Sequence, residues 1–445
     1  MALLDLTAVN VAVPSVQSSL GTDVRGLSWV LDGYTLTFAS LLLLAGGLGD
    51  RLGAKRVFVT GLAVFTLASV LCGLAPGLST LVLSRILQGV GAALFMPSSL
   101  ALLRQAYPDA RERAHAIGTW SALTAIAGAS GPVLGGLLVS SLGWRSIFLL
   151  NIPVGLVAVA ITLRFVSASP SGGRRGFDLP AQLTGAAGLA AFTWALIERS
   201  AVGWGSPRIQ LALLLAVMGA LAFVFLERRS RDPILPLHLF SNRTFSATAS
   251  AALLYAGAFF GIVLVLSLYF QQVRGDTPGV AGLHLAAITI SFGLTSLKTG
   301  RLAARHGTRA PILWGLSLLA AAAWVLALLP ATAPFALVAV PLVATGTGAG
   351  LVAPSMNAAI LASVPPALSG IGAGVLNASR QVGTALGVAV FASLFQTNLP
   401  MVAVRTSLIW AGALYLAALV LSTWAHGHAV LRTGTPVQLS PEPEL

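Results

Sequence analysis

The chain has 445 residues, of which 56% are hydrophobic and only 9% are charged, and its mean hydropathy is +0.88. A soluble globule of this size needs far more charge on its surface, so the composition excludes that class and predicts an all-α integral membrane protein. The net charge of +13 is spread between apolar runs. No run of bases is interleaved with aromatic residues, which argues against nucleic-acid binding. Cys72 is the only cysteine, so no intrachain disulfide forms and we expect a small packing residue.

Windows of about 20 apolar residues are long enough to cross a membrane as helices. Fourteen such windows follow one another along the chain, grouped as six, two and six. The predicted spans are 2–19, 28–48, 57–75, 78–103, 114–140, 146–165, 180–197, 209–226, 246–270, 281–300, 311–329, 334–354, 370–395 and 406–425.

This grouping predicts two six-helix bundles, residues 1–166 and 245–426, joined by a linker, 167–244, that carries two extra central helices. The linker begins with a stretch rich in Ser, Gly and Arg and ends with a polar stretch that contains two prolines, as is typical of joints. Residues 427–445 contain several prolines and terminal acids, and we expect a disordered cytoplasmic tail.

The placement of basic residues supports the fourteen-span count. If the loop after the second span is cytoplasmic, eighteen of the 26 Lys and Arg residues fall on the inner side and six on the outer side. Short cytoplasmic loops collect Lys and Arg. We therefore expect a multi-pass protein of the inner (cytoplasmic) membrane with both termini cytoplasmic.

The first predicted span is short for a membrane helix. A helix from Met1 to Ser19 is about 28 Å long at 1.5 Å per residue, which barely crosses the hydrocarbon layer. We expect that the true start lies upstream and that the first helix is truncated. A short helix with local bilayer thinning is a physically allowed alternative.

The most specific short signal is segment 46–56, in which glycines and charges separate two apolar runs. An acid followed by bases at this point suggests a conformational latch, and a plain cytoplasmic loop that fixes topology is the alternative. A weaker copy, residues 300–309, has Ala304 in place of the acid, so a latch should be stronger in the first half. The candidate latch residues are Gly46, Asp50, Arg51, Gly53 and Arg56.

Of the thirteen acidic residues, only Asp5 and Asp32 lie well inside predicted spans. A carboxylate at that depth costs several kcal/mol unless it is paired, hydrated or protonated, so both are candidates for proton binding. Asp5 lies roughly 20 Å from the outer end of its helix and Asp32 about 6 Å from the same side. They would form two separate stations. A structural acid paired with an arginine or capping a helix is the alternative for each.

Arg85 and Arg380 are the two bases placed deep inside spans, each with a glutamine nearby, Gln88 and Gln381. Arginine keeps its charge, so it can stabilise a neighbouring carboxylate, hold carbonyl groups or repel a cation. A buried structural base is the alternative. Asn377 belongs to the same string as Arg380 and completes this set of candidate proton- and substrate-binding residues.

The fifth predicted span contains a proline among glycines. Pro132 removes a backbone hydrogen bond and bends the helix, while Gly131 and Gly135 have the spacing that permits close helix crossing. Gly136 follows directly. Plain helix packing is the simpler interpretation, and the same contact could seal the two halves.

Other chemistries find no support in the sequence. There is no GxxxxGK[ST] string for ATP and no HExxH or paired-cysteine site for a metal. No span holds a nucleophile or an acid/base cluster, so we expect no enzyme activity, no metal and no cofactor, with the proton-motive force as the energy source.

These strings resemble the major facilitator superfamily, and within it the fourteen-helix drug/proton antiporter branch. Segment 46–56 resembles the superfamily's loop between helices 2 and 3. Segment 4–14 matches the helix 1 signature of that branch, and segment 29–34 matches the opening of its helix 2. The other matches are Arg85 with Gln88, Gly89 and Gly91 in helix 4, Gly131, Pro132, Gly135 and Gly136 in helix 5, and Asn377, Arg380 and Gln381 in helix 11.

The resemblance implies that Asp5 and Asp32 bind protons or cations, that Arg85 couples protonation to helix movement, and that Asp50 and Arg51 form the inner latch. It implies proton-driven export of a small amphipathic or cationic compound, such as a drug or antibiotic, by a monomer embedded in the lipid bilayer. The alternatives are a metabolite or sugar carrier of the same fold and a receptor that keeps the fold without transport.

Overall fold

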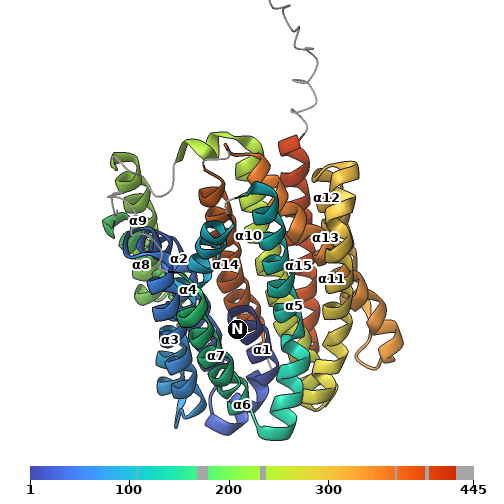
Figure 1. Ribbon diagram of the computed structural model, residues 1–445. Coiled ribbons are helices and arrows are strands. Elements are labelled where there is room, and N and C mark those ends of the chain that lie inside the picture. The colour runs from blue at the N-terminus through green and yellow to red at the C-terminus, as the bar shows by residue number, and fades with distance from the viewer. Residues whose placement is uncertain (108, 168–178, 231–236, 366–367, 396–399, 427–445) are drawn as a thin grey trace, which may run out of the picture.

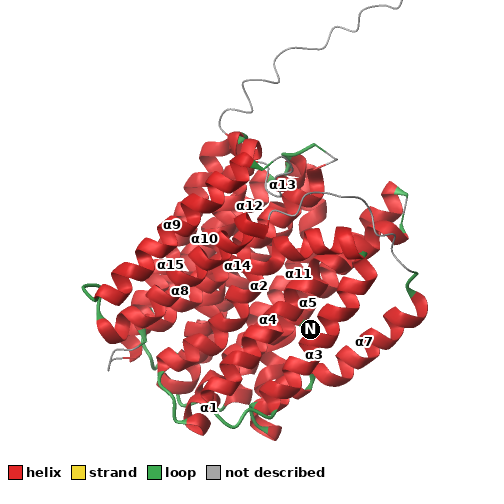
Figure 2. Ribbon diagram, turned by 90° about the vertical axis from the view of Figure 1, so that its left-hand side faces the viewer, coloured by secondary structure: helices red, strands yellow, loops and turns green. Residues whose placement is uncertain are grey.

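The computed structural model describes all residues except 108, 168–178, 231–236, 366–367, 396–399 and 427–445. Every regular element in the described part of the chain is helical (Figure 2). The predicted tail, 427–445, and much of both predicted joints lie outside the described residues. Each of the fourteen predicted spans coincides with a helical segment of the described chain.

The described residues of the first bundle form seven helices, because the sixth predicted span is divided. Leu150 separates α6 from α7, and Pro153 in the first turn of α7 has no N–H for Leu149 O. The helices are α1 (Ala2–Leu20), α2 (Val24–Leu52), α3 (Ala54–Gly73), α4 (Leu78–Ala106), α5 (Ala110–Leu142), α6 (Arg145–Leu149) and α7 (Asn151–Phe165).

The extra pair, α8 (Leu179–Val202) and α9 (Pro207–Arg229), packs as a hairpin on one flank of the molecule, where α8 contacts α2 (Figure 1). A 3₁₀ turn, η1 (Leu237–Ser241), then leads into the second bundle. That bundle comprises α10 (Arg243–Leu268), a π-helical turn η2 (Tyr269–Val273), α11 (Pro278–His306), α12 (Arg309–Leu328), α13 (Phe335–Ala362), α14 (Ser369–Leu394) and α15 (Pro400–His426).

The two bundles repeat one packing scheme. In the first, α1 packs on α5, α2 on α4, and α3 on α4 and α7; in the second, α10 packs on α14, α11 on α13, and α12 on α13 and α15. Between the bundles, α2 packs on α14 and α5 on α11, while α8 touches both α2 and α14. The weak repeat in the sequence therefore corresponds to a repeated arrangement of helices.

Nine helices of the described chain are long and apolar enough to cross a membrane. Their outer faces carry large apolar side chains that water would not accommodate. On α9, for example, Leu211, Met218 and Leu221 are each more than half exposed. This surface is that of a protein surrounded by lipid tails.

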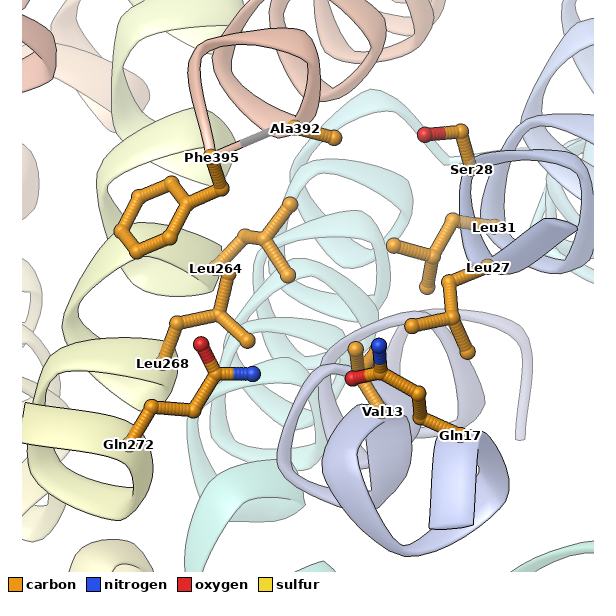
Figure 3. A pocket seen from close by; sticks show the side chains of 10 residues that line it. All are labelled: Val13, Gln17, Leu27, Ser28, Leu31, Leu264, Leu268, Gln272, Ala392 and Phe395. Atoms are coloured by element: carbon orange, nitrogen blue, oxygen red, sulfur yellow. The ribbon is translucent and has the colours of Figure 1, made fainter. Parts of the chain in front are cut away.

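The bundles are in direct contact along the second half of α1 and the first turns of α2. Ser267 Oγ on α10 donates a hydrogen bond to Asn10 O on α1 (3.0 Å), and Gln271 Nε2 on η2 donates to Val11 O (3.1 Å). Leu264 and Leu268 face the first bundle across a pocket of only about 10 Å³ (Figure 3). We call this region the closed end.

Candidate functional site

A buried polar cluster surrounds Asp5 in the first bundle. The Asp5 carboxylate, on α1, forms an ion pair with Arg85 Nη1 on α4. It also accepts hydrogen bonds from Asn151 Nδ2 at the start of α7 (3.1 Å) and from Gln88 Nε2 (3.4 Å). Asp5, Arg85 and Gln88 are fully buried, and Asn151 is 2% exposed. We call these four residues the Asp5 cluster.

Local helix geometry explains why Arg85 and Gln88 meet Asp5 together. They are three residues apart on α4, so they project from the same face of the helix. Gln88 Oε1 accepts from Arg85 Nη1 (2.7 Å), and Gln88 Nε2 also donates to Ser69 Oγ on α3 (2.7 Å). The cluster thus links α1, α3, α4 and α7 through side chains that orient one another.

Arg85 keeps other partners besides Asp5. Its Nε donates to Val30 O on α2 (3.0 Å), and its guanidinium carbon lies 4.4 Å from the centre of the Tyr34 ring. A cation over an aromatic face is stabilised by the ring's quadrupole. These contacts hold the guanidinium in place independently of Asp5, so the carboxylate can change its charge without releasing Arg85 completely.

Asp32 occupies a different site, on α2. Its side chain is fully buried, and Oδ1 accepts one hydrogen bond from Thr35 Oγ1 at 3.5 Å. Oδ2 has no hydrogen-bond partner among the described residues, and no hydrogen bond in that part of the chain joins Asp32 to Asp5. The two acids therefore lie in separate environments, one rich in donors and one poor in them.

In the second bundle, Arg380 on α14 reaches across to α13. Its Nη1 donates to Asn357 Oδ1 (3.1 Å) and its Nη2 to Ala353 O (2.8 Å). Within the described chain its Nε and Gln381 Oε1 are buried without a partner, and Asn377 is half-buried. The structure does not join Arg380 to Asn377 or Gln381 by a hydrogen bond.

The proline motif of α5 packs against both bundles. A Cβ on Gly135 would lie 2.8 Å from Ala8 O on α1, and one on Gly136 would lie 2.5 Å from Pro278 O at the start of α11. Both distances are too short for a real Cβ contact, so these positions require glycine. Gly131 and Gly135 thus tighten packing within the first bundle, whereas Gly136 forms the crossing between the two halves.

Pro132 leaves Gly128 O without its usual partner, because proline has no N–H to donate to the carbonyl four residues earlier. Thr7 Oγ1 on α1 donates to that carbonyl at 2.7 Å. Gly131 makes room for the approach, since a Cβ there would meet the Thr7 side chain and lie 2.9 Å from Ala8 N. Proline, glycine and threonine together dock α5 onto α1.

In segment 46–56, α2 ends at Leu52 and α3 begins at Ala54, with Gly53 between them at φ 88°. Arg51 and Arg56 are exposed, while the surroundings of Gly46 and the side chain of Asp50 lie outside the described part of the chain. Lys55 Nζ donates to Val166 O (2.6 Å) and Leu163 O (3.3 Å), at the end of α7. The conformational latch therefore stays a prediction. The contacts of Lys55 attach the segment to the end of α7.

A cavity of about 110 Å³ lies between the bundles, lined by α1, α5, α10 and α11. Thr7 and Pro132 belong to its wall on one side and Phe259 and Thr289 on the other. None of the candidate residues Asp5, Asp32, Arg85 and Arg380 lines it. The cavity and the buried charges are therefore separate parts of the molecule.

Sequence reasoning missed Asn151, Asn357, Thr7 and Ser69 as members of these polar contacts. Asn151 has a visible signal, since an Asn-Ile-Pro string interrupts the apolar run 146–165. The other three look like ordinary small or polar residues of a helix, and only the packing of neighbouring helices shows their partners.

Comparison with known proteins places the chain among transporters. A family model described as Major Facilitator Superfamily matches residues 1–388. The chain is 42% identical over 389 residues to the methylenomycin A resistance protein of Streptomyces coelicolor, covering 87% of this chain and 82% of the relative. It is 37% identical over 393 residues to the multidrug resistance protein Stp of Mycobacterium tuberculosis, covering 88% and 73%.

A solved structure shares the fold. The crystal structure of the human organic anion transporter MFSD10 (TETRAN) matches with a TM-score of 0.62, covering 95% of this chain and 96% of the other, at 17% sequence identity. The likeness extends across both bundles, and at this identity it concerns the fold alone.

Proposed function

The chain belongs to the Major Facilitator Superfamily, and on that premise we propose that it exports a small amphipathic drug or antibiotic across the cytoplasmic membrane in exchange for protons. The resistance names of its relatives support export of an antibacterial compound. We take all fourteen helical segments as membrane spans, with both termini cytoplasmic, as in the fourteen-helix drug/proton antiporter branch.

The observation that carries proton coupling is the buried Asp5 cluster. Three side chains donate to the Asp5 carboxylate, and one of them is the positively charged Arg85. When a proton binds, one carboxyl oxygen becomes a donor and the carboxylate loses its negative charge, which leaves the Arg85 cation without a counter-ion. The groups around Asp5 must then rearrange, so the position of α1 depends on the proton.

Helix α1 connects this proton site to the rest of the cycle. Asp5 faces α4 and α7, whereas Thr7 contacts α5 and lines the cavity. Further along, Asn10 O and Val11 O accept hydrogen bonds from the second bundle. A shift of α1 therefore reaches the cavity wall and the closed end together, as alternating access requires.

The closed end faces outward if the loop charges fix the orientation as the sequence predicts. The conformation is then one that is sealed toward the outside, with the cavity on the cytoplasmic side of the seal. Asp32, with a single hydrogen bond at 3.5 Å, would be the second proton station, because its surroundings offer little to a negative charge.

The proposal is tested by substrate accumulation in cells that lack their own efflux pumps. Cells that make the protein should accumulate less of an exported antibiotic, and a protonophore should abolish the difference. Asp5→Asn should remove export at equal protein level in the membrane. Glu112→Gln, which neutralises an exposed acid, is the matched control and should export normally. Export by Asp5→Asn at the full rate would contradict the role of Asp5.

A further inference from the structure

The described residues that line the cavity between the bundles are all uncharged. Its lining residues are apolar except for three threonines, Thr7, Thr124 and Thr289. An ion placed there would lose its hydration without gaining a counter-ion, at a cost far above that of a neutral molecule. The wall therefore favours an uncharged ligand.

The volume sets the size of that ligand. The cavity measures about 110 Å³, and an apolar cavity of roughly 150 Å³ in another protein admits benzene. A single ring of five or six atoms fits this volume. Phe259 and Phe260, whose ring centres lie 5.4 Å apart at nearly right angles, belong to the wall with Phe292 and offer the flat contacts that a ring requires.

Hydrogen bonds within the protein already use two of the three threonine hydroxyl groups. Thr7 Oγ1 donates to Gly128 O, and Thr124 Oγ1 donates to Trp120 O at 2.7 Å. In the described part of the chain, the Thr289 hydroxyl has no hydrogen bond. One donor in an otherwise apolar wall is therefore available to a ligand.

We propose that this cavity binds a neutral, single-ring compound that carries one hydrogen-bond acceptor, such as a ring ketone, and that Thr289 donates to that acceptor. The assignment rests on the proposed export function and narrows its substrate class. It separates the substrate from the proton: the substrate occupies an uncharged cavity, while the proton binds the Asp5 cluster on the opposite face of α1. Cationic compounds are then poor ligands of this cavity.

Binding to the purified protein tests the assignment without any need for transport. The protein is placed in lipid nanodiscs, and equilibrium dialysis with labelled cyclohexanone measures binding above that of empty nanodiscs. Three probes of similar size compete: methylenecyclohexane, which lacks the acceptor, cyclohexylammonium and cyclohexanecarboxylate. We expect saturable binding of cyclohexanone, weaker binding of methylenecyclohexane and no competition by either ion. Absence of saturable binding, or equal competition by an ion, overturns the assignment.

Variants locate the site. Thr289→Val removes the hydroxyl at constant shape and should weaken cyclohexanone binding roughly three- to tenfold, the range expected for one neutral hydrogen bond, while methylenecyclohexane binds as before. Ile290→Val changes the adjacent side chain of α11, which is 60% exposed, and should leave both affinities unchanged. Val263→Ile extends a side chain of the wall into the cavity and should weaken both ligands. Unchanged cyclohexanone binding in Thr289→Val and Val263→Ile overturns the assignment.

The two proposals fail in different ways. If another compound is exported with protons while cyclohexanone does not bind, the cavity assignment is wrong and the export function stands. If cyclohexanone binds as described but no compound is exchanged for protons, the cavity assignment stands and proton-coupled export is wrong.

Discussion

Thr7 Oγ1 lies 2.7 Å from Gly128 O and donates to it the hydrogen bond that Pro132 is unable to supply. A break in the backbone ladder of α5 is thereby converted into a bond between α5 and α1. Thr7 and Pro132 also line the cavity, and Thr7 lies two residues from Asp5. The proline motif, the substrate cavity and the proton site are therefore connected through one short stretch of α1.

This relationship predicts a specific coupling between Thr7 and Pro132. Thr7→Val should leave Gly128 O unpaired and destabilise the protein by roughly 1 kcal/mol, since hydrogen bonds between membrane helices contribute about 0.6–2 kcal/mol. Pro132→Ala restores an N–H four residues after Gly128, so the same Thr7→Val change should cost little in that background. Thermal unfolding of the four proteins in detergent measures the coupling. Equal losses in both backgrounds would show that Thr7 does not replace the proline's missing donor.

The crossing of α5 and α11 predicts a steric effect on the closed end. A Cβ on Gly136 would lie 2.5 Å from the backbone oxygen of Pro278 and 3.1 Å from Gly282 Cα, so Gly136→Ala should force the helices apart and slow transport more than tenfold. The transport rate measures the slowing. The alkylation of a cysteine introduced at Gln17, near the closed end, measures whether the helices move apart. The native Cys72 is buried.

Gly293→Ala is the control for this prediction. Gly293 lies on α11 like Gly282, but a Cβ there has no heavy atom within 4 Å, so its transport rate should match that of the unmodified protein. If Gly136→Ala transports normally and Gln17→Cys is labelled no faster in its presence, the closed end does not depend on this crossing.

The ion pair of Asp5 and Arg85 predicts that substitutions can restore the stability of the protein without restoring proton-coupled export. Asp5→Asn leaves the Arg85 cation buried without its carboxylate, and breaking a buried pair costs about 3–5 kcal/mol. Adding Arg85→Met should recover much of the unfolding temperature, because no unpaired charge remains, yet it should not restore proton-coupled export. Recovery of export in the double variant would mean that the pair has only a structural role.

The contacts of Lys55 with the last carbonyl groups of α7 predict that segment 46–56 anchors this helix. Lys55 Nζ donates to Val166 O and Leu163 O, where the last carbonyls of a helix attract a cation. Lys55→Gln should lower the stability of the purified protein by roughly 0.5–1 kcal/mol, measured by thermal unfolding. Arg301→Gln, which removes an exposed base from α11, should have no such effect. Equal stability of both variants would show that Lys55 does not anchor α7.

The sequence was sufficient to predict the helices but not their partners. The apolar windows mark all fourteen helical segments, and 78–103, for example, corresponds to α4 at Leu78–Ala106. The break at Leu150 and the π-helical turn at Tyr269–Val273 were missed, because hydropathy does not register a local change in backbone hydrogen bonding.

The candidate site was predicted one residue at a time. A charge deep in an apolar span is visible in the sequence, so Asp5 and Arg85 stood out, but that they pair depends on how α1 packs near α4 and α7. The contribution of Asn151, the docking of Thr7 on Gly128 and the uncharged wall of the cavity arise from helices far apart in the chain. These features follow from tertiary packing, which periodicity does not encode.

The most direct test of proton-coupled export is the change of internal pH in everted membrane vesicles that carry the protein. A proton gradient is imposed, and candidate antibiotics are then added one at a time to vesicles with the unmodified protein or Asp5→Asn. We expect an exported compound to dissipate the gradient only when Asp5 is present. Dissipation of equal size in Asp5→Asn vesicles, or transport of the compound without any proton movement, would contradict this expectation.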